Sequence, residues 1–262
     1  MELHCQIASL AYKKRRILHD VAFSAGAGEF IAVIGKNGQG KSTLIRALSG
    51  QMPYLGHITL DGDELSALPV RERATRISLM PQQLTAPHIT VRELLSFARA
   101  PYRSLSGRSR EDEQAIASAI RDADLESLAD CYLDRISGGE LRRAYFGMVL
   151  AQDTPLLLLD EATAFLDAEY EARLIGLVRR SAAERGKTVV AVMHSPEYAL
   201  SYADRILLLS GGTVRFFGTP EELLSTGLPE EIFGLRRFTA RSADGEERVF
   251  FSAAVPANTA RL

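Results

Sequence analysis

Apolar residues along this chain follow two patterns that are both typical of β-strands. Residues 3–10 and 17–23 alternate loosely between apolar and polar positions, and a basic stretch separates them. Alternation with a period of two predicts half-buried strands, here an antiparallel pair joined by a charged turn. Residues 30–34 and 156–159 are apolar without alternation, and so is the β-rich run 188–193 after its first residue, Thr188. Such runs predict strands buried on both faces, as in a parallel sheet covered by helices.

Between about residues 90 and 150, apolar positions recur three and four residues apart. This periodicity predicts amphipathic helices, with a polar loop near 101–110. Towards the C-terminus, 205–217 and 238–251 each predict a β-hairpin, with two short helices between them near 221–224 and 230–233. The predicted fold class is α/β, with a mostly parallel sheet, an N-terminal antiparallel β subdomain and an inserted helical subdomain.

A length of 262 residues is long for one compact domain and short for two, so we expect a single domain over 1–262. Its catalytic core is expected at about 1–83 and 151–235, its helical subdomain at 84–150 and its C-terminal tail at 236–262. The net charge of -2 provides no basic footprint for nucleic acid. No apolar run approaches the roughly 18 residues of a bilayer span, and the start lacks signal-peptide architecture, so a cytosolic chain is expected. Cys5 and Cys131 predict neither a disulfide framework nor a zinc site.

The segment between the apolar run 30–34 and the next helical pattern is rich in glycine. It contains Gly35, Asn37, Gly38, Gly40, Lys41, Ser42 and Thr43. This spacing is that of a P-loop, in which backbone N–H groups and a helix N-terminus surround a phosphate chain. Lys41 is predicted to reach the terminal phosphates and Ser42 to bind a magnesium ion. A tight turn without a ligand is the alternative, but glycine, lysine and hydroxyl at this spacing favour a P-loop NTPase core.

Polar side chains also follow three of the predicted core strands. Gln82 follows the run 77–80, Asp160 and Glu161 follow four leucines, and His194 ends the run 188–193. Open α/β sheets bind ligands at this edge, and two acids there are costly unless they are paired. We expect Asp160 to hold magnesium through water and Glu161 to polarise the attacking water. We expect His194 to contact the γ-phosphate. The alternative for Gln82 is an ordinary loop residue, and for the Asp160–Glu161 pair it is a surface turn. For His194 the alternative is a structural role.

Three further features each have two interpretations. Residues 137–140, Ser-Gly-Gly-Glu, precede a helical pattern and form either a simple capping box or a second phosphate-binding helix N-terminus. Tyr12 is either an ordinary strand aromatic or a residue that stacks on a nucleotide base. Asp167 is either the N-cap of the next helix or a residue of the site.

Taken in order, these motifs resemble those of the ATP-binding subunits of ABC transporters over nearly the whole chain. Gly35 to Thr43 resembles the Walker A loop, and Ser137 to Glu140, after Ile136 where leucine is usual, resembles the signature. Residues 155–161 resemble Walker B with its catalytic glutamate, and residues 164–167 resemble the D-loop. Gln82 stands where the family has its Q-loop, and His194 stands where it has the switch histidine. Tyr12 stands where an aromatic residue stacks on adenine.

The resemblance implies a mechanism that one chain cannot complete. Two subunits form a head-to-tail homodimer, and each ATP lies between one Walker A loop and the other chain's Ser137, Gly138 and Gly139. ATP closes the dimer, and hydrolysis to ADP and phosphate, with Glu161 and His194 orienting the water, opens it. The implied cofactors are ATP and Mg²⁺. The implied catalytic residues also include Lys41 and Gln82. The implied metal site consists of Ser42, Gln82 and Asp160.

Within this family the chain looks most like the motors of importers for iron chelates, haem or cobalamin. The similarity lies in residues 217–220 and 232–235 and in the single ATPase domain. One departure is Ser195-Pro196-Glu197 after the switch histidine, where aspartate and leucine are usual. The implied partners are separate polytopic permease subunits and, through them, a substrate-capture protein, at the cytoplasmic face of the cell membrane. An exporter motor and a soluble ABC ATPase of the iron–sulfur assembly type are the alternatives.

Overall fold

The computed structural model describes residues 1–13, 15–103, 109–162, 168–241 and 247–253. Its largest sheet has six strands in the order β10-β9-β3-β8-β7-β6. Their bounds are Phe30–Ile34 for β3, Ile77–Met80 for β6, Leu156–Asp160 for β7, Thr188–Val192 for β8, Arg205–Ser210 for β9 and Thr213–Gly218 for β10. Neighbours from β9 to β6 run parallel, and β10 pairs antiparallel with β9. The mostly parallel sheet is therefore confirmed.

A second sheet of four strands, in the order β2-β1-β4-β5, is antiparallel throughout. It contains β1 (Leu3–Tyr12), β2 (Arg15–Ala25), β4 (Leu55–Leu60) and β5 (Asp63–Glu64). Helix α1 (Lys41–Leu48) packs against both sheets, since one buried cluster joins Ile7 and Leu18 to Ile45 and to Val33 of β3. The N-terminal antiparallel subdomain is confirmed, and it covers the helix that begins at the glycine-rich loop.

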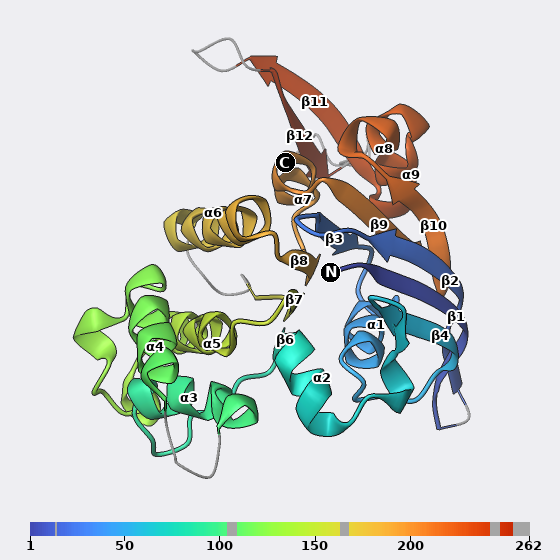
Figure 1. Cartoon of the computed structure of the whole chain (residues 1–262). Helices are drawn as coiled ribbons and strands as arrows, with labels where there is room; N and C mark the ends of the chain where they lie inside the picture. Colours follow the sequence, from blue (N-terminus) through green and yellow to red (C-terminus); the bar gives the residue numbers. More distant parts are fainter. Residues whose placement is uncertain (14, 104–108, 163–167, 242–246, 254–262) are drawn as a thin grey trace.

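Helices lie on the other face of the six-stranded sheet and beside it (Figure 1). They are α3 (Val91–Ala98), α4 (Arg110–Asp122), α5 (Gly138–Gln152) and α6 (Ala168–Arg185), with short 3-10 turns at Ala100–Tyr102, Glu126–Leu128 and Leu133–Arg135. A second buried cluster joins Leu95, Phe146 and Val178 to Leu159. The helical insertion between β6 and β7 is thus confirmed, while its limits as a subdomain stay a prediction. None of the described helices combines the length and apolar character of a bilayer span.

Two short helices have no counterpart among the predicted elements. Helix α2 (Val70–Arg76) has no buried residue, so its sequence carries no apolar stripe that a pattern could detect. Helix α7 (Pro196–Tyr202) follows Ser195, whose hydroxyl accepts a hydrogen bond from the Tyr198 N–H at 3.3 Å. The tripeptide after His194 that departs from the importer pattern is thus the start of a capped helix.

The C-terminal elements agree with prediction. After the β9–β10 hairpin come α8 (Pro220–Thr226), α9 (Leu228–Phe233), and the antiparallel strands β11 (Leu235–Arg241) and β12 (Glu247–Ala253). The β11–β12 hairpin projects from the rest of the molecule at the top of Figure 1.

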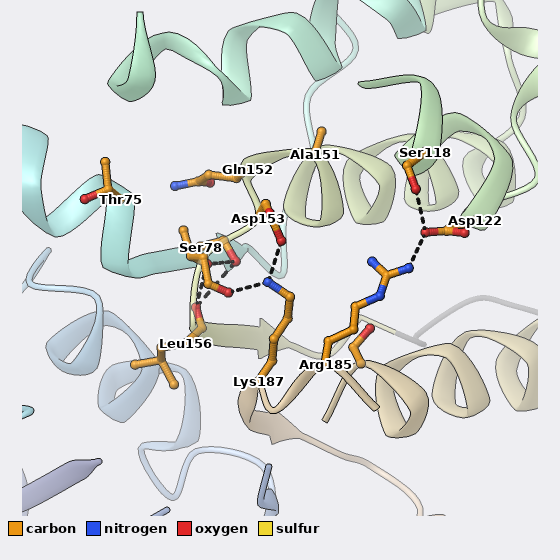
Figure 2. Close-up of polar contacts among 12 residues, drawn as sticks. Thr75, Ser78, Ser118, Asp122, Ala151, Gln152, Asp153, Leu156, Arg185 and Lys187 are labelled. Atoms are coloured by element: carbon orange, nitrogen blue, oxygen red, sulfur yellow. Dashed lines mark hydrogen bonds and ion pairs between the residues drawn. The ribbon is translucent and has the colours of Figure 1, made fainter. Parts of the chain in front are cut away.

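A polar cluster ties the end of α5 to the amino ends of the parallel strands (Figure 2). Lys187, just before β8, donates from Nζ to Asp153 Oδ1 at 2.7 Å and to the Thr154 carbonyl at 2.8 Å. The Gln152 side-chain amide donates to the Ala74 carbonyl at 2.7 Å and to the Ile77 carbonyl at 3.0 Å. The C-terminus of α5 is therefore fixed to both α2 and the sheet.

A buried ion pair holds the helical insertion together. Arg99 donates from Nε to Asp112 Oδ1 at 2.8 Å and from Nη1 to the Ala151 carbonyl at 3.0 Å, joining α3, α4 and α5. Both side chains are almost completely buried. Burial disfavours the ionised carboxylate of Asp112 and by itself raises its pKa. Hydrogen bonds from Ser109 and Arg99 have the larger combined effect and hold the pKa of Asp112 below its ordinary value.

We expect Asp112→Asn to lower the free energy of unfolding by about 3–5 kcal/mol, because it leaves the Arg99 guanidinium buried without its counter-charge. Urea unfolding followed by circular dichroism measures this. The matched control is Asp130→Asn, which removes an exposed partner of Arg92 and is expected to cost less than about 1 kcal/mol. Equal losses in the two variants would contradict a stabilising role for the buried pair.

Candidate active site

The glycine-rich loop connects β3 to α1 with a backbone that requires glycine at two points. Gly35 has φ +151°, and a Cβ there would collide with the Leu209 carbonyl oxygen of β9. Gly40, the N-cap of α1, has φ +90°. These left-handed positions allow the chain to turn sharply from the buried strand into the helix. The first N–H groups of α1 therefore point into the loop, where they can bind an anion.

Lys41, the first residue of α1, lies inside this loop. Its Nζ donates to the Gly35 carbonyl at 2.7 Å and to the Lys36 carbonyl at 3.1 Å. Burial lowers the pKa of Lys41, while the charges of Glu161 and Asp160 act in the opposite direction. The Lys41 ammonium can form charge-assisted hydrogen bonds with phosphate oxygens, which are stronger than neutral ones.

Ser42 and Asp160 are in contact where a divalent cation is predicted. The Ser42 hydroxyl donates to Asp160 Oδ1 at 2.9 Å. Burial raises the pKa of Asp160, and the hydrogen bond from Ser42 opposes this rise. A hydroxyl and a buried carboxylate are hard oxygen donors of the kind that magnesium accepts together with phosphate oxygens and water. The donor chemistry of the site thus fits Mg²⁺.

Glu161, which directly follows β7, is held by side chains that follow the two strands on either side of β7. Gln82, after β6, donates from Nε2 to Glu161 Oε2 at 2.5 Å. His194, after β8, has its Nε2 at 2.8 Å from the same oxygen. The three residues that the sequence placed at strand ends therefore meet at one carboxylate, which suits the orientation of a water molecule for attack.

A cavity of about 510 Å³ connects the loop to this carboxylate. It is lined by Arg15, Ile17, Asn37, Gly38, Gly40, Lys41, Ser42, Thr43, Gln82, Glu161 and His194. Tyr12 lies outside it, 62% exposed, and lines an adjoining cavity of about 340 Å³ with Arg15, Ile17, Thr43, Arg46 and Met52. The two cavities share Arg15, Ile17 and Thr43, so together they offer room for a phosphate chain and an attached base.

The signature residues are not part of this cavity. Ser137, Gly138 and Gly139 form the start of α5, and none of them lines the space above the glycine-rich loop. The Ser137 hydroxyl accepts from the Glu140 N–H at 3.3 Å, and Glu140 Oε2 accepts from the Ser137 N–H at 2.7 Å. The capping box is therefore present. A phosphate-binding role for this helix N-terminus stays a prediction, and the predicted D-loop, 164–167, lies outside the described residues.

Two arginines near the site were missed from the sequence. Arg15 lines both cavities, but it belongs to a basic stretch that predicts only a charged turn. Arg142 is buried and donates from Nη1 to the Glu161 carbonyl at 2.9 Å. The sequence did contain a signal for its burial. Arg142 precedes the apolar residues Tyr145 and Phe146 by three and four positions, and this helical spacing places it on the buried face of the helix.

Comparison with known proteins agrees with this geometry. The family model described as ABC transporter matches residues 18–164. Ferric enterobactin transport ATP-binding protein FepC of Escherichia coli (strain K12) is 40% identical over 231 residues, covering 87% of this chain and 85% of that protein. Hemin import ATP-binding protein HmuV of Nocardia farcinica (strain IFM 10152) is 39% identical over 221 residues, covering 84% and 76% respectively.

Among solved structures, an inward-facing protein proposed to be a metal-chelate type ABC transporter superposes with a TM-score of 0.82. The match covers 96% of this chain and 98% of that chain, at 23% sequence identity. At this identity the likeness bears on the fold, which is that of a P-loop NTPase.

Proposed function

Because this chain belongs to the ABC transporter family of ATP-binding proteins, we propose that it is the ATP-hydrolysing motor subunit of a membrane importer for iron chelates or haem. The cargo class follows the relatives named for ferric enterobactin and hemin. Cobalamin, the third cargo class expected from the sequence, stays a prediction. The ATP-hydrolysing part of this proposal rests on one observation. Gln82 and His194 hold the carboxylate of Glu161 in the cavity that the glycine-rich loop lines.

The chain is an ATPase, and different residues of the site would bind the phosphates, bind the metal ion and orient the water. The N–H groups of Gly38 and Gly40 and the Lys41 ammonium would bind the β- and γ-phosphates. Ser42, Asp160 and Gln82 would hold Mg²⁺, which neutralises charge on the phosphate oxygens when it is bound.

Hydrolysis needs a water molecule in line with the terminal phosphate. Glu161 would accept a hydrogen bond from this water and His194 would contact the γ-phosphate. Tyr12 would stack on adenine in the adjoining cavity, which its exposed ring lines.

The remaining contacts would come from a second copy. Ser137, Gly138 and Gly139 lie outside the cavity of their own chain, so a head-to-tail homodimer would bring them to the ATP of the partner. The dimer would act on separate permease subunits at the cytoplasmic face of the membrane, and a capture protein would deliver cargo to the permease. Closing and opening of the dimer would drive transport.

Affinity purification tests the transport assignment. Tagged Glu161→Gln protein is bound to ATP in detergent-solubilised membranes of the source cells, and co-purified chains are identified by mass spectrometry. We expect a polytopic permease encoded with a chelate- or haem-capture protein, and much less of it with the control Lys41→Ala, which should not close around ATP. Recovery of an iron–sulfur assembly scaffold, or of an exporter permease, would overturn the importer assignment and leave the ATPase chemistry standing.

A further inference from the structure

Arg142 is a buried charged residue of α5. It is the fifth residue of that helix, four positions after Gly138. Its Nη1 donates to the Glu161 carbonyl at 2.9 Å and lies 3.5 Å from the Ala162 carbonyl. Hydrogen bonds from a charged donor to backbone carbonyls are among the stronger ones in a protein interior. The helix that follows the signature is thus joined directly to the segment that carries the catalytic carboxylate.

The backbone at Glu161 needs such support. Glu161 has φ +55°, a left-handed conformation that costs a residue with a side chain about 1–2 kcal/mol. This conformation aims the side chain towards Gln82 and His194. Those two residues hold the carboxylate, and Arg142 holds the carbonyl, so the glutamate is fixed at both ends.

We propose that Arg142 is a positioning residue that holds Glu161 in its hydrolytic conformation and couples that conformation to the placement of the signature helix. The coupling rests on the proposed function, in which Ser137 at the start of α5 meets the ATP of the partner subunit. A shift of α5 on closure moves the Arg142 guanidinium, and with it the Glu161 backbone of the same chain. Filling one ATP site thereby alters the geometry of the attacking water in the other.

The test compares Arg142→Met and Arg142→Lys with the matched control Arg143→Met. Arg143 stands next in the same helix but donates to the Asp124 carbonyl at 2.9 Å, away from the cavity. Steady-state ATPase assays give kcat and KM. Hydrogen exchange of peptides spanning residues 156–162, in nucleotide-free protein, reports on the Glu161 backbone without requiring turnover.

We expect Arg142→Met to lower kcat by about tenfold or more while the KM for ATP changes by less than about threefold, because the phosphate-binding loop is untouched. Exchange of the 156–162 peptides should rise by about tenfold or more. Arg142→Lys should recover part of both effects, and Arg143→Met should show neither. In a Glu161→Gln background, Arg142→Met should add little to the loss of rate, because both changes act on the same group.

Two results would overturn the proposal. One is unchanged exchange of the 156–162 peptides in Arg142→Met. The other is a fall in kcat that is fully additive with Glu161→Gln, which would indicate a general structural effect. Absence of ATPase activity in the unmodified protein would instead contradict the proposed function, and the exchange measurement would still decide the role of Arg142.

Discussion

Glu161→Gln is expected to bind ATP with near-normal affinity but to hydrolyse it about 10²–10⁴ times more slowly. Glutamine keeps the size of the side chain and can still accept a hydrogen bond in the position held by Gln82 and His194. It lacks the basic carboxylate that we propose orients and polarises the attacking water, and loss of such a group typically has an effect of this size. In the proposed mechanism hydrolysis opens the head-to-tail dimer, so the variant should also accumulate as an ATP-bound dimer.

Phosphate release and multi-angle light scattering measure these two effects on the same preparation. The matched control is Glu184→Gln, the same chemical change on an exposed position of α6, where both rate and mass should equal those of the unmodified protein. A Glu161→Gln protein that stays monomeric in saturating ATP would refute the proposed ATP-driven dimerisation, whatever its hydrolysis rate.

Lys41→Ala should weaken ATP binding at least about 30-fold. The Lys41 ammonium is buried beside the carboxylates of Asp160 and Glu161, and its removal leaves those charges facing the phosphates without compensation. Truncation of one partner in such a desolvated charge pair commonly costs about 2–5 kcal/mol, and 2 kcal/mol corresponds to roughly 30-fold in Kd.

Isothermal titration calorimetry with ATP and magnesium measures this affinity. Lys36→Ala provides the control, since it removes the same charge from the same loop while its exposed side chain lies outside the cavity. The control should bind within about threefold of the unmodified protein. Near-normal affinity of Lys41→Ala would contradict the P-loop assignment.

Much of the fold was predictable because its signals are local. Runs such as 156–159 contain no polar position, and a strand of that kind is stable only where helices and sheet neighbours cover both faces. The meeting of Gln82, Glu161 and His194 was also predictable, since the carboxyl ends of neighbouring parallel strands share one edge.

What escaped prediction depends on contacts between distant segments. The bond from Arg142 to the Glu161 carbonyl joins residues 19 apart in the chain and leaves no motif. Helix α2 lacks an apolar stripe and is positioned by contacts with other segments, including the hydrogen bond from Gln152 to the Ala74 carbonyl. The phosphate-binding role proposed for Ser137 would need a second chain, so neither the sequence nor the structure of one chain tests it.

The polar cluster that fixes the C-terminus of α5 allows the helix to act as a lever, with the fixed end as its pivot and the N-terminus as its moving tip. Its C-terminus is pinned by the Lys187–Asp153 pair and by Gln152, while Ser137 lies at the opposite end of its 15 residues. At 1.5 Å per residue the lever is about 22 Å long, so a tilt of about 5° about the pinned end moves its tip by about 2 Å. In the proposed dimer, small rotations at the sheet would therefore be amplified at the subunit boundary, and removal of the Lys187 ammonium should reduce the closing motion without contacting either nucleotide.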